Sequence, residues 1–542
     1  QRMKPDAKLR NGDSEAMWQE YLGFMDLDIE GYMAIQRRLM QEQLRLWCGS
    51  NLGRSILCGT PVPHTIEEFR NVVPLTVYDD YAEVLLSKRD EDLPEPAAIW
   101  IKTTWEGGKH PIKIAPYTQG MLDTYRTNMG ACIIMFGATE KGKFTIGKRV
   151  LSGFAPLPYA TGLMGLMLRQ ETDMRFLPPH EEAQDMSFSQ KTKQGLKLAM
   201  KEGLDYFFSM GSVAYCISGM LSKAGGGHGG RVSLRAALRY LRAKMRCARE
   251  NREMLPKDLF TLTSLVCAGT DNRCYKDELE HMWGVRPMEI FAGTEPTLIG
   301  TETWNRNGLY FFPDACFYEF LPLSEAEKLR ADPNHRPFTA LMNEVRPGEK
   351  YELVISVLKG GAFARYRTGD VYCCEGLSSR GDQTSLPRFR YIDRISDIID
   401  IAGFTRITED SIRSVIEMSG LPIEAWFAAK ELDAAGHPFL HLYVELKQGR
   451  EVNYALTCEI LREHLSVYFK YLDADYKDLK RLLNMDPLQV TILTGGAFER
   501  FRAVHGHSLR AMNPSQSDVA EILALQRASS APAKYYTAGG DD

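Results

Sequence analysis

A strand, a helix and a second strand follow one another between residues 262 and 295, and this unit constrains the fold more than any other part of the sequence. Residues 262–270 form an apolar run that ends in small side chains, residues 275–283 have helical spacing, and residues 285–295 form a second apolar run. Two strands joined by a helix in this way lie parallel in one sheet. Because ligands of such sheets bind at the carboxyl ends of the strands, both strand ends are predicted to face one crevice.

Glu295, at the end of the second run, is a candidate ligand for Mg²⁺ in that crevice. Mg²⁺ is commonly held by one or two carboxylates together with phosphate oxygens. The alternative is an acidic residue at a helix N-terminus, where a negative charge is favourable.

A second candidate binding stretch spans residues 361–370, with the sequence Gly-Ala-Phe-Ala-Arg-Tyr-Arg-Thr-Gly-Asp. The alternating run of residues 351–358 predicts a strand that ends at a Gly-Gly pair, with a second strand and its turn following toward Asp370. A carboxylate fixed there suits a sugar diol, because its two oxygens can accept two hydroxyl hydrogens. An ordinary hairpin with a Gly-Asp turn is the alternative.

A third candidate is the polar loop between two short strands at residues 99–101 and 112–116. Its residues Thr103, Thr104, Gly107, Gly108 and Lys109 could wrap phosphates with backbone N–H groups and a lysine charge. A basic hairpin with a glycine turn is the alternative. Further along, the apolar run 155–167 contains glycines and could line a pocket for an apolar group or form a buried strand-to-helix turn.

Apolar residues at helical spacing predict helices over residues 14–48, 189–222 and 232–254. Thr65 with Glu68 three residues later is a capping box, which predicts a short helix that Pro74 ends. Thr76 is expected to cap the next helix. The helix over 232–254 is rich in arginine, and we interpret it as a solvated face rather than a nucleic-acid patch.

Composition bounds the remaining possibilities. A chain of 542 residues is too long for one core, so two or three domains are expected. A formal net charge of -4 gives no overall attraction to nucleic acid or anionic membranes. The 11 cysteines are scattered without metal spacing, which is typical of reduced thiols in a cytoplasmic protein. The apolar runs are too short to span a bilayer, and no secretory signal opens the chain.

The sequence therefore predicts an α/β protein with two domains. Residues 1–394 are expected to form a large domain with mixed or parallel sheets and packed helices. A composition shift near 376–388 precedes a small α+β domain, expected over residues 395–528. Residues 529–542 are small and polar and are expected to be a flexible tail.

The order of these motifs resembles the acyl-adenylate-forming superfamily and, within it, the Gretchen Hagen-type acyl-acid amido synthetases (the auxin-responsive promoter family). The resemblance covers nearly the whole chain. It rests on residues 68–81, the loop 103–109, Phe-Ala-Gly-Thr-Glu at 291–295, Tyr-Arg-Thr-Gly-Asp at 366–370, Asp393-Arg394 with Gly403, and Gly-Ala-Phe-Glu-Arg-Phe at 496–501. Each segment alone is modest evidence, but six in the same order are hard to obtain by chance.

The resemblance implies that the large domain, residues 1–394, binds the nucleotide and the acyl group and that residues 395–528 form a mobile lid domain. It also implies roles for individual residues. Asp370 would bind the ribose hydroxyls, Thr294 would touch the α-phosphate, and Glu295 would hold Mg²⁺. The implied nucleotide-binding residues are Thr103, Thr104, Gly107, Gly108, Lys109, Gly269, Thr270, Phe291, Ala292, Gly293, Thr294, Tyr366, Asp370 and Arg394. The implied catalytic residues are Thr294, Glu295 and Arg510. Tyr159, Thr161 and Gly162 would face the acyl group.

The implied reaction uses ATP and Mg²⁺. A small carboxylic acid and ATP give an acyl-adenylate and pyrophosphate, and an amine, usually from an amino acid, then attacks the acyl carbon. The C-terminal domain of such enzymes rotates between the half-reactions, here about a hinge near residues 394–397. No nucleic-acid or membrane partner is expected, and the protein is expected to be a monomer or homodimer.

Two departures from the family pattern affect the end of the site that handles phosphates. The loop carries Trp105 and Glu106 where the family has small hydroxyl residues and glycine. The family's catalytic lysine would fall at about Met512, and Arg510 is the nearest cation, while Lys534 lies in the tail. Two alternatives therefore stay open: a ligase that passes the acyl group to coenzyme A or a carrier thiol, and a homologue that binds nucleotide or acyl-adenylate without full adenylation activity.

Overall fold

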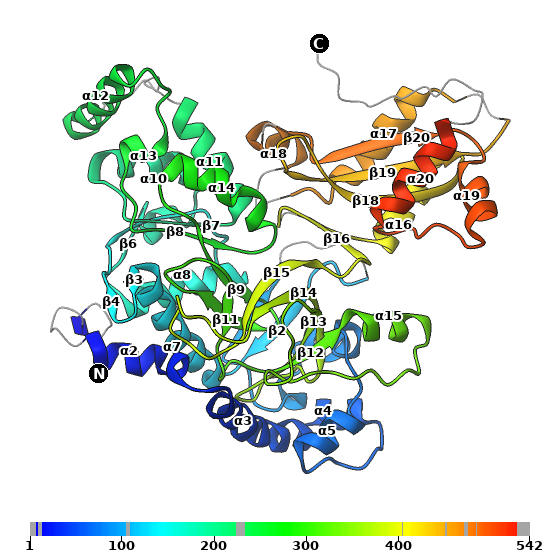
Figure 1. Cartoon of the computed structure of the whole chain (residues 1–542), viewed down its shortest axis with the longest axis horizontal. Coiled ribbons are helices and arrows are strands. Elements are labelled where there is room, and N and C mark those ends of the chain that lie inside the picture. Colours follow the sequence, from blue (N-terminus) through cyan, green and yellow to red (C-terminus); the bar gives the residue numbers. More distant parts are fainter. Residues whose placement is uncertain are drawn as a thin grey trace. The chain divides into compact units, whose positions relative to one another are not determined.

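The computed structural model packs into two compact units (Figure 1). The N-terminal unit comprises residues 1–103 and 112–393, and the C-terminal unit comprises residues 104–111 and 394–542. The structure describes residues 7–8, 14–103, 109–223, 233–403, 405–449, 452–470, 475–483 and 485–527.

An eleven-stranded sheet forms the centre of the N-terminal unit as far as that unit is described. In spatial order its strands are β12 (Cys316–Pro322), β13 (Lys350–Val357), β14 (Tyr366–Gly376), β15 (Arg388–Arg394), β11 (Leu309–Phe311), β10 (Thr297–Glu302), β9 (Met288–Gly293), β8 (Ser264–Ala268), β7 (Tyr206–Ser209), β5 (Arg149–Ser152) and β6 (Arg175–Leu177). The run from β9 to β6 is parallel, whereas β9–β10–β11–β15 and β12–β13–β14 pair antiparallel. The predicted mixed α/β fold is confirmed.

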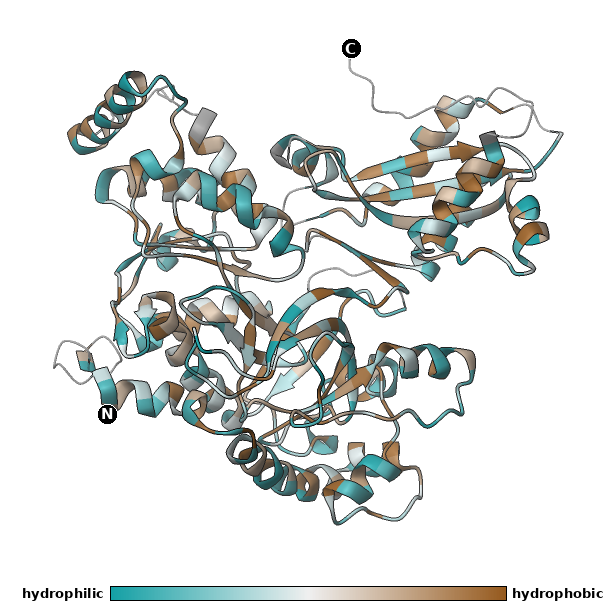
Figure 2. Cartoon of the chain, in the orientation of Figure 1, coloured by the Kyte–Doolittle hydropathy of each residue, from teal (hydrophilic) through white to brown (hydrophobic). Residues whose placement is uncertain are grey.

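The predicted strand–helix–strand unit is present as β8, α14 (Asn272–Trp283) and β9. The two strands are parallel, with Cys267 opposite Glu289. Every residue of β8 is buried, because the sheet is covered on both faces at this strand. In Figure 2 the brown colour along the strands marks the hydrophobic residues of the sheet.

Helices pack around the sheet. They are α2 (Ser14–Leu22), α3 (Ile29–Gly49), α4 (Asn51–Leu57), α5 (Ile66–Val72), α6 (Ala82–Leu86), α7 (Gln119–Phe136), α8 (Ala160–Glu171), α9 (His180–Ala183), α10 (Phe188–Glu202), α11 (Gly211–Lys223), α12 (Leu234–Arg249), α13 (Pro256–Leu259) and α15 (Leu323–Ala331), with short 3-10 turns η1 (Gly23–Asp26), η2 (Tyr78–Asp80) and η3 (Asp90–Asp92). Thr65 and Glu68 form the predicted capping box at the start of α5. The predicted helix over 14–48 is divided by η1 into α2 and α3.

Within the described N-terminal unit, two hairpins lie outside the large sheet: β1 (Ile99–Lys102) with β2 (Ile114–Tyr117), and β3 (Ala138–Glu140) with β4 (Lys143–Phe144). The first hairpin leads directly into α7, whose N-terminus is capped by the Thr118 hydroxyl accepting from the Met121 N–H. The polar loop identified in the sequence is thus the connection between β1 and β2.

Two local predictions are wrong. Thr76 caps no helix, because its hydroxyl donates to the Ala364 carbonyl oxygen at 2.8 Å and its backbone pairs with that of Tyr366. The predicted helix over 189–222 contains strand β7 between α10 and α11. The four residues of β7 are all buried, and a short apolar run of that kind cannot be distinguished from a buried helix by periodicity.

The C-terminal unit has α+β architecture. Its elements are β16 (Ile398–Ile401), β17 (Thr405–Thr408), α16 (Glu409–Ser419), β18 (Ile423–Leu432), β19 (Pro438–Leu446), α17 (Tyr454–Ser466), α18 (Tyr476–Leu483), β20 (Leu488–Leu493), α19 (Ala497–His505) and α20 (Gln516–Arg527). β18 and β19 are antiparallel, and β20 runs parallel to β19. Phe427, Phe501 and Ile522 belong to its core. The predicted tail, residues 529–542, lies outside the described residues.

Candidate functional site

The chain turns sharply at the carboxyl end of β8, where the sequence places Gly269 and Thr270. Gly269 has a φ of 98°, a left-handed value that favours glycine, and Thr270 is buried. Asn272 secures the turn: its amide nitrogen donates to the Gly269 oxygen and its amide oxygen accepts from the Gly211 N–H, both at 2.9 Å. Because Gly211 follows β7, these bonds hold the ends of β7 and β8 together.

Strand β9 ends in the turn that carries Thr294 and Glu295. The hydroxyl of Tyr117, the last residue of β2, lies 2.8 Å from the Thr294 carbonyl oxygen and 3.1 Å from that of Gly293, and donates to them. Burial raises the pKa of the Tyr117 hydroxyl well above its usual value, so the group remains a donor. The hairpin β1–β2 therefore fixes the position of this turn.

The Glu295 carboxylate meets groups from two other segments. The Tyr366 hydroxyl donates to Glu295 Oε1 at 2.7 Å, and the Lys113 ammonium lies 3.5 Å from the same oxygen. Lys113 Nζ also lies 5.7 Å from the ring centroid of Tyr78. The Glu295 side chain is 12% exposed, so a ligand can reach it. We call Lys113, Glu295 and Tyr366 the Glu295 cluster.

Lys113 was missed in the sequence, and the register of the hairpin explains its position. The Thr103 N–H donates to the Lys113 oxygen at 2.9 Å, and the Lys113 N–H donates to Thr103 Oγ1 at 3.0 Å. The loop therefore opens and closes on this pair, with the lysine at its far end. This lysine could have been identified by predicting the register of the hairpin, which pairs Lys113 with Thr103.

The predicted phosphate loop is described only at its two ends. Thr104, Gly107 and Gly108 lie outside the described residues, as do Trp105 and Glu106. Lys109 is described and exposed, and Thr103 is buried.

Asp370 follows an irregular point in β14. Gly369 has a φ of 76°, and the register with β13 shifts at this position. The Asp370 N–H donates to the Thr368 hydroxyl at 3.1 Å, and its side chain is buried. The predicted Gly-Asp turn is therefore a bulge within one strand.

The Phe291 ring packs inside the protein. Its centroid lies 5.5 Å from that of Tyr391, in a stacked arrangement, and 5.5 Å from that of Tyr372, edge to face. Ala292 and Gly293, which follow at the end of β9, are half-buried. Contact with a nucleotide base in this strand would therefore involve Ala292 and Gly293 more than the Phe291 ring.

The segment predicted to face an acyl group begins helix α8. Tyr159, Thr161 and Gly162 are all half-buried. Gly162 permits a close approach, because a Cβ there would lie 2.1 Å from the Leu157 nitrogen. Lys102 joins this segment to the phosphate-loop hairpin: its N–H donates to the Pro158 oxygen at 3.0 Å, and its ammonium lies 5.0 Å from the Tyr159 ring centroid.

The remaining predicted residues belong to the C-terminal unit. Arg394 is half-buried, and its Nε lies 3.9 Å from Asp400 Oδ2. Arg510 forms an ion pair with Asp397. Met512 is buried and its backbone bridges to that of Ala428 beside β18.

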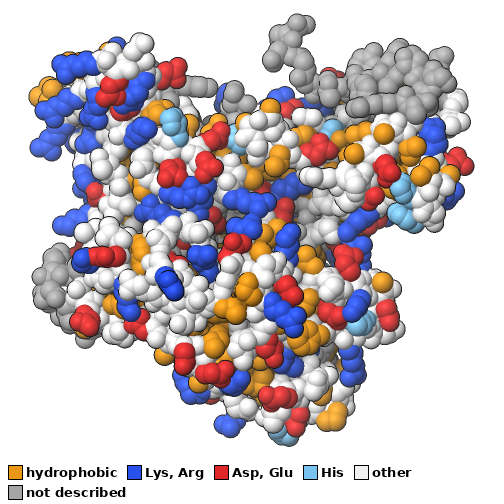
Figure 3. Space-filling model, in the orientation of Figure 1, with side chains coloured by type: hydrophobic (Ala, Val, Ile, Leu, Met, Phe, Trp, Pro, Cys, Tyr) orange, Lys and Arg blue, Asp and Glu red, His pale blue; other side chains and the backbone are white. Residues whose placement is uncertain are grey.

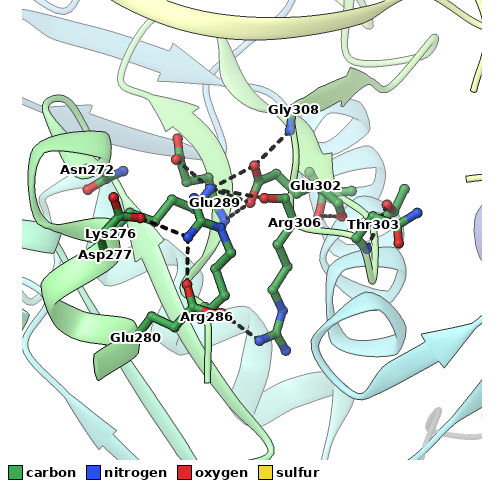
Figure 4. A network of polar contacts seen from close by, with 12 residues as sticks. Asn272, Lys276, Asp277, Glu280, Arg286, Glu289, Glu302, Thr303, Arg306 and Gly308 are labelled. Carbon is green, nitrogen blue, oxygen red and sulfur yellow. Dashed lines mark hydrogen bonds and ion pairs between the residues drawn. The ribbon is translucent and has the colours of Figure 1, made fainter. Parts of the chain in front are cut away.

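A buried ion cluster fastens α14 to the hairpin β9–β10 (Figure 4). The Lys276 ammonium lies 2.9 Å from Glu289 Oε1 and 3.0 Å from Glu302 Oε1. The Glu302 carboxylate also accepts from the N–H groups of Glu289 and Gly308, at 2.8 and 2.9 Å. We call Lys276, Glu289 and Glu302 the Lys276 cluster. It holds the start of α14, and so the Gly269 turn, in a fixed relation to β9.

The described residues could hold Mg²⁺ only if a bound ligand supplied further coordinating oxygens. They include no group of three or more His, Cys, Asp or Glu side chains that could hold a metal. Glu295 is a single carboxylate that a ligand can reach. One carboxylate with phosphate oxygens is a common arrangement for Mg²⁺, so the residues present fit a metal that arrives with a polyphosphate.

Comparison with protein families identifies one segment of the N-terminal unit. Residues 309–394 match the model described as the GH3 family central domain. This segment is therefore similar to a GH3 central domain. This segment runs from β11 to β15 and contains Tyr366 and Asp370. The family resemblance drawn from the motifs is therefore confirmed. No curated protein sequence matches significantly.

Solved structures share the fold of this chain. An acyl acid amido synthetase, AtGH3.15 in complex with 2,4-DB, is 15% identical, with 97% of each chain covered and a TM-score of 0.51. A second GH3.15 acyl acid amido synthetase structure gives 16% identity, 97% coverage of each chain and a TM-score of 0.51. A 2-hydroxyisobutyryl-CoA ligase in complex with 2-HIB-AMP and CoA gives 15% identity, 88% coverage of each chain and a TM-score of 0.56.

Proposed function

We propose that this GH3-type protein is an adenylate-forming acyl-acid ligase. It activates a small carboxylic acid with ATP and transfers the acyl group to an amine, giving an amide. The observation that carries the proposal is the GH3 central domain over residues 309–394, whose Tyr366 donates to Glu295 at 2.7 Å. The shared fold with an acyl acid amido synthetase supports it.

In the first step a carboxylate oxygen of the acid attacks the α-phosphorus of ATP, and pyrophosphate leaves. The acid and the polyphosphate are both anionic, so the site must offset their repulsion. Lys113 supplies a positive charge 3.5 Å from Glu295, at the end of the loop that opens at Thr103. Asp370 accepts hydrogen bonds from the ribose hydroxyls, and Thr294 contacts the α-phosphate.

Mg²⁺ held by Glu295 and phosphate oxygens would offset charge on the polyphosphate. The Tyr366 hydroxyl orients the Glu295 carboxylate toward that position through its 2.7 Å hydrogen bond. Tyr117 keeps the Thr294–Glu295 turn in place by donating to its carbonyl oxygens.

In the second step the amine nitrogen attacks the acyl carbon, AMP leaves with one oxygen of the original carboxylate, and the nitrogen loses a proton. A thiol acceptor is the second candidate, because the fold is also shared with 2-hydroxyisobutyryl-CoA ligase at a TM-score of 0.56. The product formed with each acceptor distinguishes the two. Amide from an amine, or hydroxamate from hydroxylamine, indicates the amide ligase, whereas thioester from coenzyme A indicates the thioester ligase.

Pyrophosphate release with ATP, Mg²⁺ and a panel of carboxylic acids tests the proposal. At least one acid is expected to stimulate release, and Lys113→Met is expected to lower its rate by roughly a hundredfold, the effect of removing one charge-stabilising group. Lys88→Met, which removes an exposed lysine outside the Glu295 cluster, is the matched control and should act as wild type.

Protein that is stabilised against heat by ATP or AMP but releases no pyrophosphate with any acid would contradict the proposal. That result would favour the homologue that binds nucleotide without activating an acid. Met512→Lys is a poor test of the missing catalytic lysine, because Met512 is buried beside β18 and a charge there would destabilise the C-terminal unit.

A further inference from the structure

Helix α12 (Leu234–Arg249) turns its largest apolar side chains away from the protein. Leu234, Leu238, Leu241 and Met245 are 76%, 44%, 51% and 54% exposed. Their spacing of four, three and four residues places them in one stripe along the helix. A surface helix ordinarily buries such a stripe against its own domain, but the described part of the chain leaves the α12 stripe exposed.

The opposite face of α12 is the one that packs on the protein, and it is made of small residues. Ala236, Ala243 and Cys247 are the buried positions. Arg239 adds a further attachment, because its guanidinium donates to the Leu259 oxygen at 3.1 Å and lies 5.4 Å from the Phe260 ring centroid. The α12 stripe therefore contributes little to the fold, and a contiguous exposed apolar patch marks an interaction surface.

Cations flank the α12 stripe on both sides. At 100° per residue, Arg235, Arg242, Arg246 and Arg249 fall along one side and Lys244 falls along the other, and all five are exposed. The sequence of the helix contains no acidic residue. Figure 3 shows lysine and arginine side chains gathered over α12, at the upper left, with hydrophobic side chains among them. This local positive charge stands out in a chain whose formal net charge is -4.

We propose that α12 lies in the surface of an anionic lipid bilayer. The α12 stripe enters the boundary between headgroups and acyl chains, while the flanking guanidinium and ammonium groups bind lipid phosphates and carboxylates. Helices with an apolar stripe and an arginine- and lysine-rich polar face bind membranes in this way. From its sequence this basic helix is expected to be a solvated face, and no membrane partner is expected. The outward stripe is the observation that changes that expectation.

Two features favour a bilayer over a protein partner. A stable protein–protein interface buries about 800 Å² on each side, which is more than four side chains on one convex helix can supply. The cations of α12 are not interrupted by acidic residues, so together they suit a continuous anionic surface. Each cation close to an anionic bilayer adds to the attraction between helix and membrane. The attachment is peripheral, since no helix among the described residues is long and apolar enough to cross a membrane.

Sedimentation of the full chain with lipid vesicles tests this proposal. We expect binding to vesicles of phosphatidylcholine and phosphatidylserine at a ratio of about 7:3, weaker binding to phosphatidylcholine alone, and loss of binding as salt is raised. Leu238→Gln with Leu241→Gln is expected to weaken binding at least about tenfold. Arg242→Gln with Arg246→Gln should weaken binding to the anionic vesicles only.

Two matched controls separate the α12 stripe from general surface effects. Met418→Gln with Val504→Gln removes two apolar side chains of similar exposure, and Arg37→Gln with Arg45→Gln removes two exposed arginines on α3. Both pairs should bind vesicles as wild type, and thermal unfolding should show that all variants fold.

Three results would overturn the proposal. They are the absence of binding to phosphatidylserine vesicles at low salt, unchanged binding after Leu238 and Leu241 are replaced, and a self-association in solution that the same replacements abolish without any vesicle binding. The last result would assign the α12 stripe to a second copy of the chain. None of the three bears on pyrophosphate release, so this proposal and the proposed ligase activity fail separately.

Discussion

Asp370 is the residue whose proposed role can be tested most simply. If its two carboxylate oxygens accept hydrogen bonds from the two ribose hydroxyls, Asp370→Asn removes the charge and replaces one acceptor oxygen with an NH2 donor at nearly unchanged shape. Hydrogen bonds to charged groups contribute roughly 1.5–3 kcal/mol, so AMP should bind about ten- to a hundredfold more weakly. Titration calorimetry with AMP measures this, with Asp410→Asn, an exposed change on α16, as the control. Unchanged affinity would remove Asp370 from the site.

Glu319 carries a pH dependence of stability. It lies buried between Arg365, with contacts of 2.9 and 3.1 Å, and Arg70, at 3.2 Å. Burial alone would raise the pKa of Glu319, but the two guanidinium groups and the Thr339 hydroxyl hold it below its usual value. The stabilisation is therefore complete above about pH 4.3, the value of an unfolded Glu, and is lost as the pH falls through the lower pKa of the folded protein.

Denaturant unfolding between pH 3 and 7 is the corresponding measurement. Glu319→Gln should lower the free energy of unfolding by about 3 kcal/mol at pH 7, because it leaves Arg365 buried without its charge partner. The loss should shrink toward pH 3, where wild type also loses the charge. Glu42→Gln, in an exposed pair with Arg38, is the control and should follow wild type throughout. A loss independent of pH would show that the charge of Glu319 does not matter.

At the scale of elements, the Lys276 cluster makes α14 and the hairpin β9–β10 one unit. Burial first, and then the Glu289 carboxylate, raise the pKa of Glu302, while Lys276 opposes that rise. Lys276→Met would leave the two carboxylates facing each other and should lower the free energy of unfolding by about 3 kcal/mol at pH 7. Lowering the pH should restore part of the loss, since protonation of Glu302 relieves the repulsion.

Chemical denaturation at pH 7 and pH 5 measures this effect, and Lys193→Met, at an exposed position of α10, is its control. AMP binding should weaken together with stability, because the Gly269 turn precedes α14 directly. A stable Lys276→Met variant with full AMP affinity would show that the cluster does not position the turn.

The elements that the sequence predicted correctly share a local signal. A few neighbouring residues suffice to predict the helix that begins with Thr65 and Glu68, and the same holds for the strand before Gly360. Strand β7 gave no such signal, because its burial comes from neighbouring strands far away in the sequence. Lys113 was missed for a related reason: its place beside Glu295 depends on hairpin register and on a contact with a residue 182 positions away.

At the scale of the whole molecule, the candidate site joins the β1–β2 hairpin, the turn after β9 and strand β14. The sequence identified Glu295 and Tyr366 separately, through motifs, and the structure joins them by a 2.7 Å hydrogen bond. Arg394 and Arg510 lie in the C-terminal unit, where Asp400 and Asp397 are their partners. The order of the motifs was enough to predict these residues, but the hydrogen-bond and ion-pair partner of each one depends on how the chain packs.

The proposed hinge near residues 394–397 coincides with ionic contacts in the C-terminal unit. Arg510, the cation nearest to the missing lysine, pairs with Asp397. Asp397→Asn would remove this carboxylate from Arg510. Because Arg510 is proposed in place of the missing lysine, we expect pyrophosphate release to change more than the second half-reaction, amide formation from a preformed acyl-adenylate. Single-turnover assays of each half-reaction measure this, and equal effects on both would exclude a role in only one of them.

The central claim is that the acid is activated as an adenylate. The most direct measurement uses an acid from the active panel, labelled with oxygen-18 in both carboxylate positions, together with ATP and the amine acceptor. Mass spectrometry of the products should find one labelled oxygen in AMP and the other in the amide, because AMP leaves with the oxygen that attacked the α-phosphorus. Unlabelled AMP, or label in inorganic phosphate, would contradict the account.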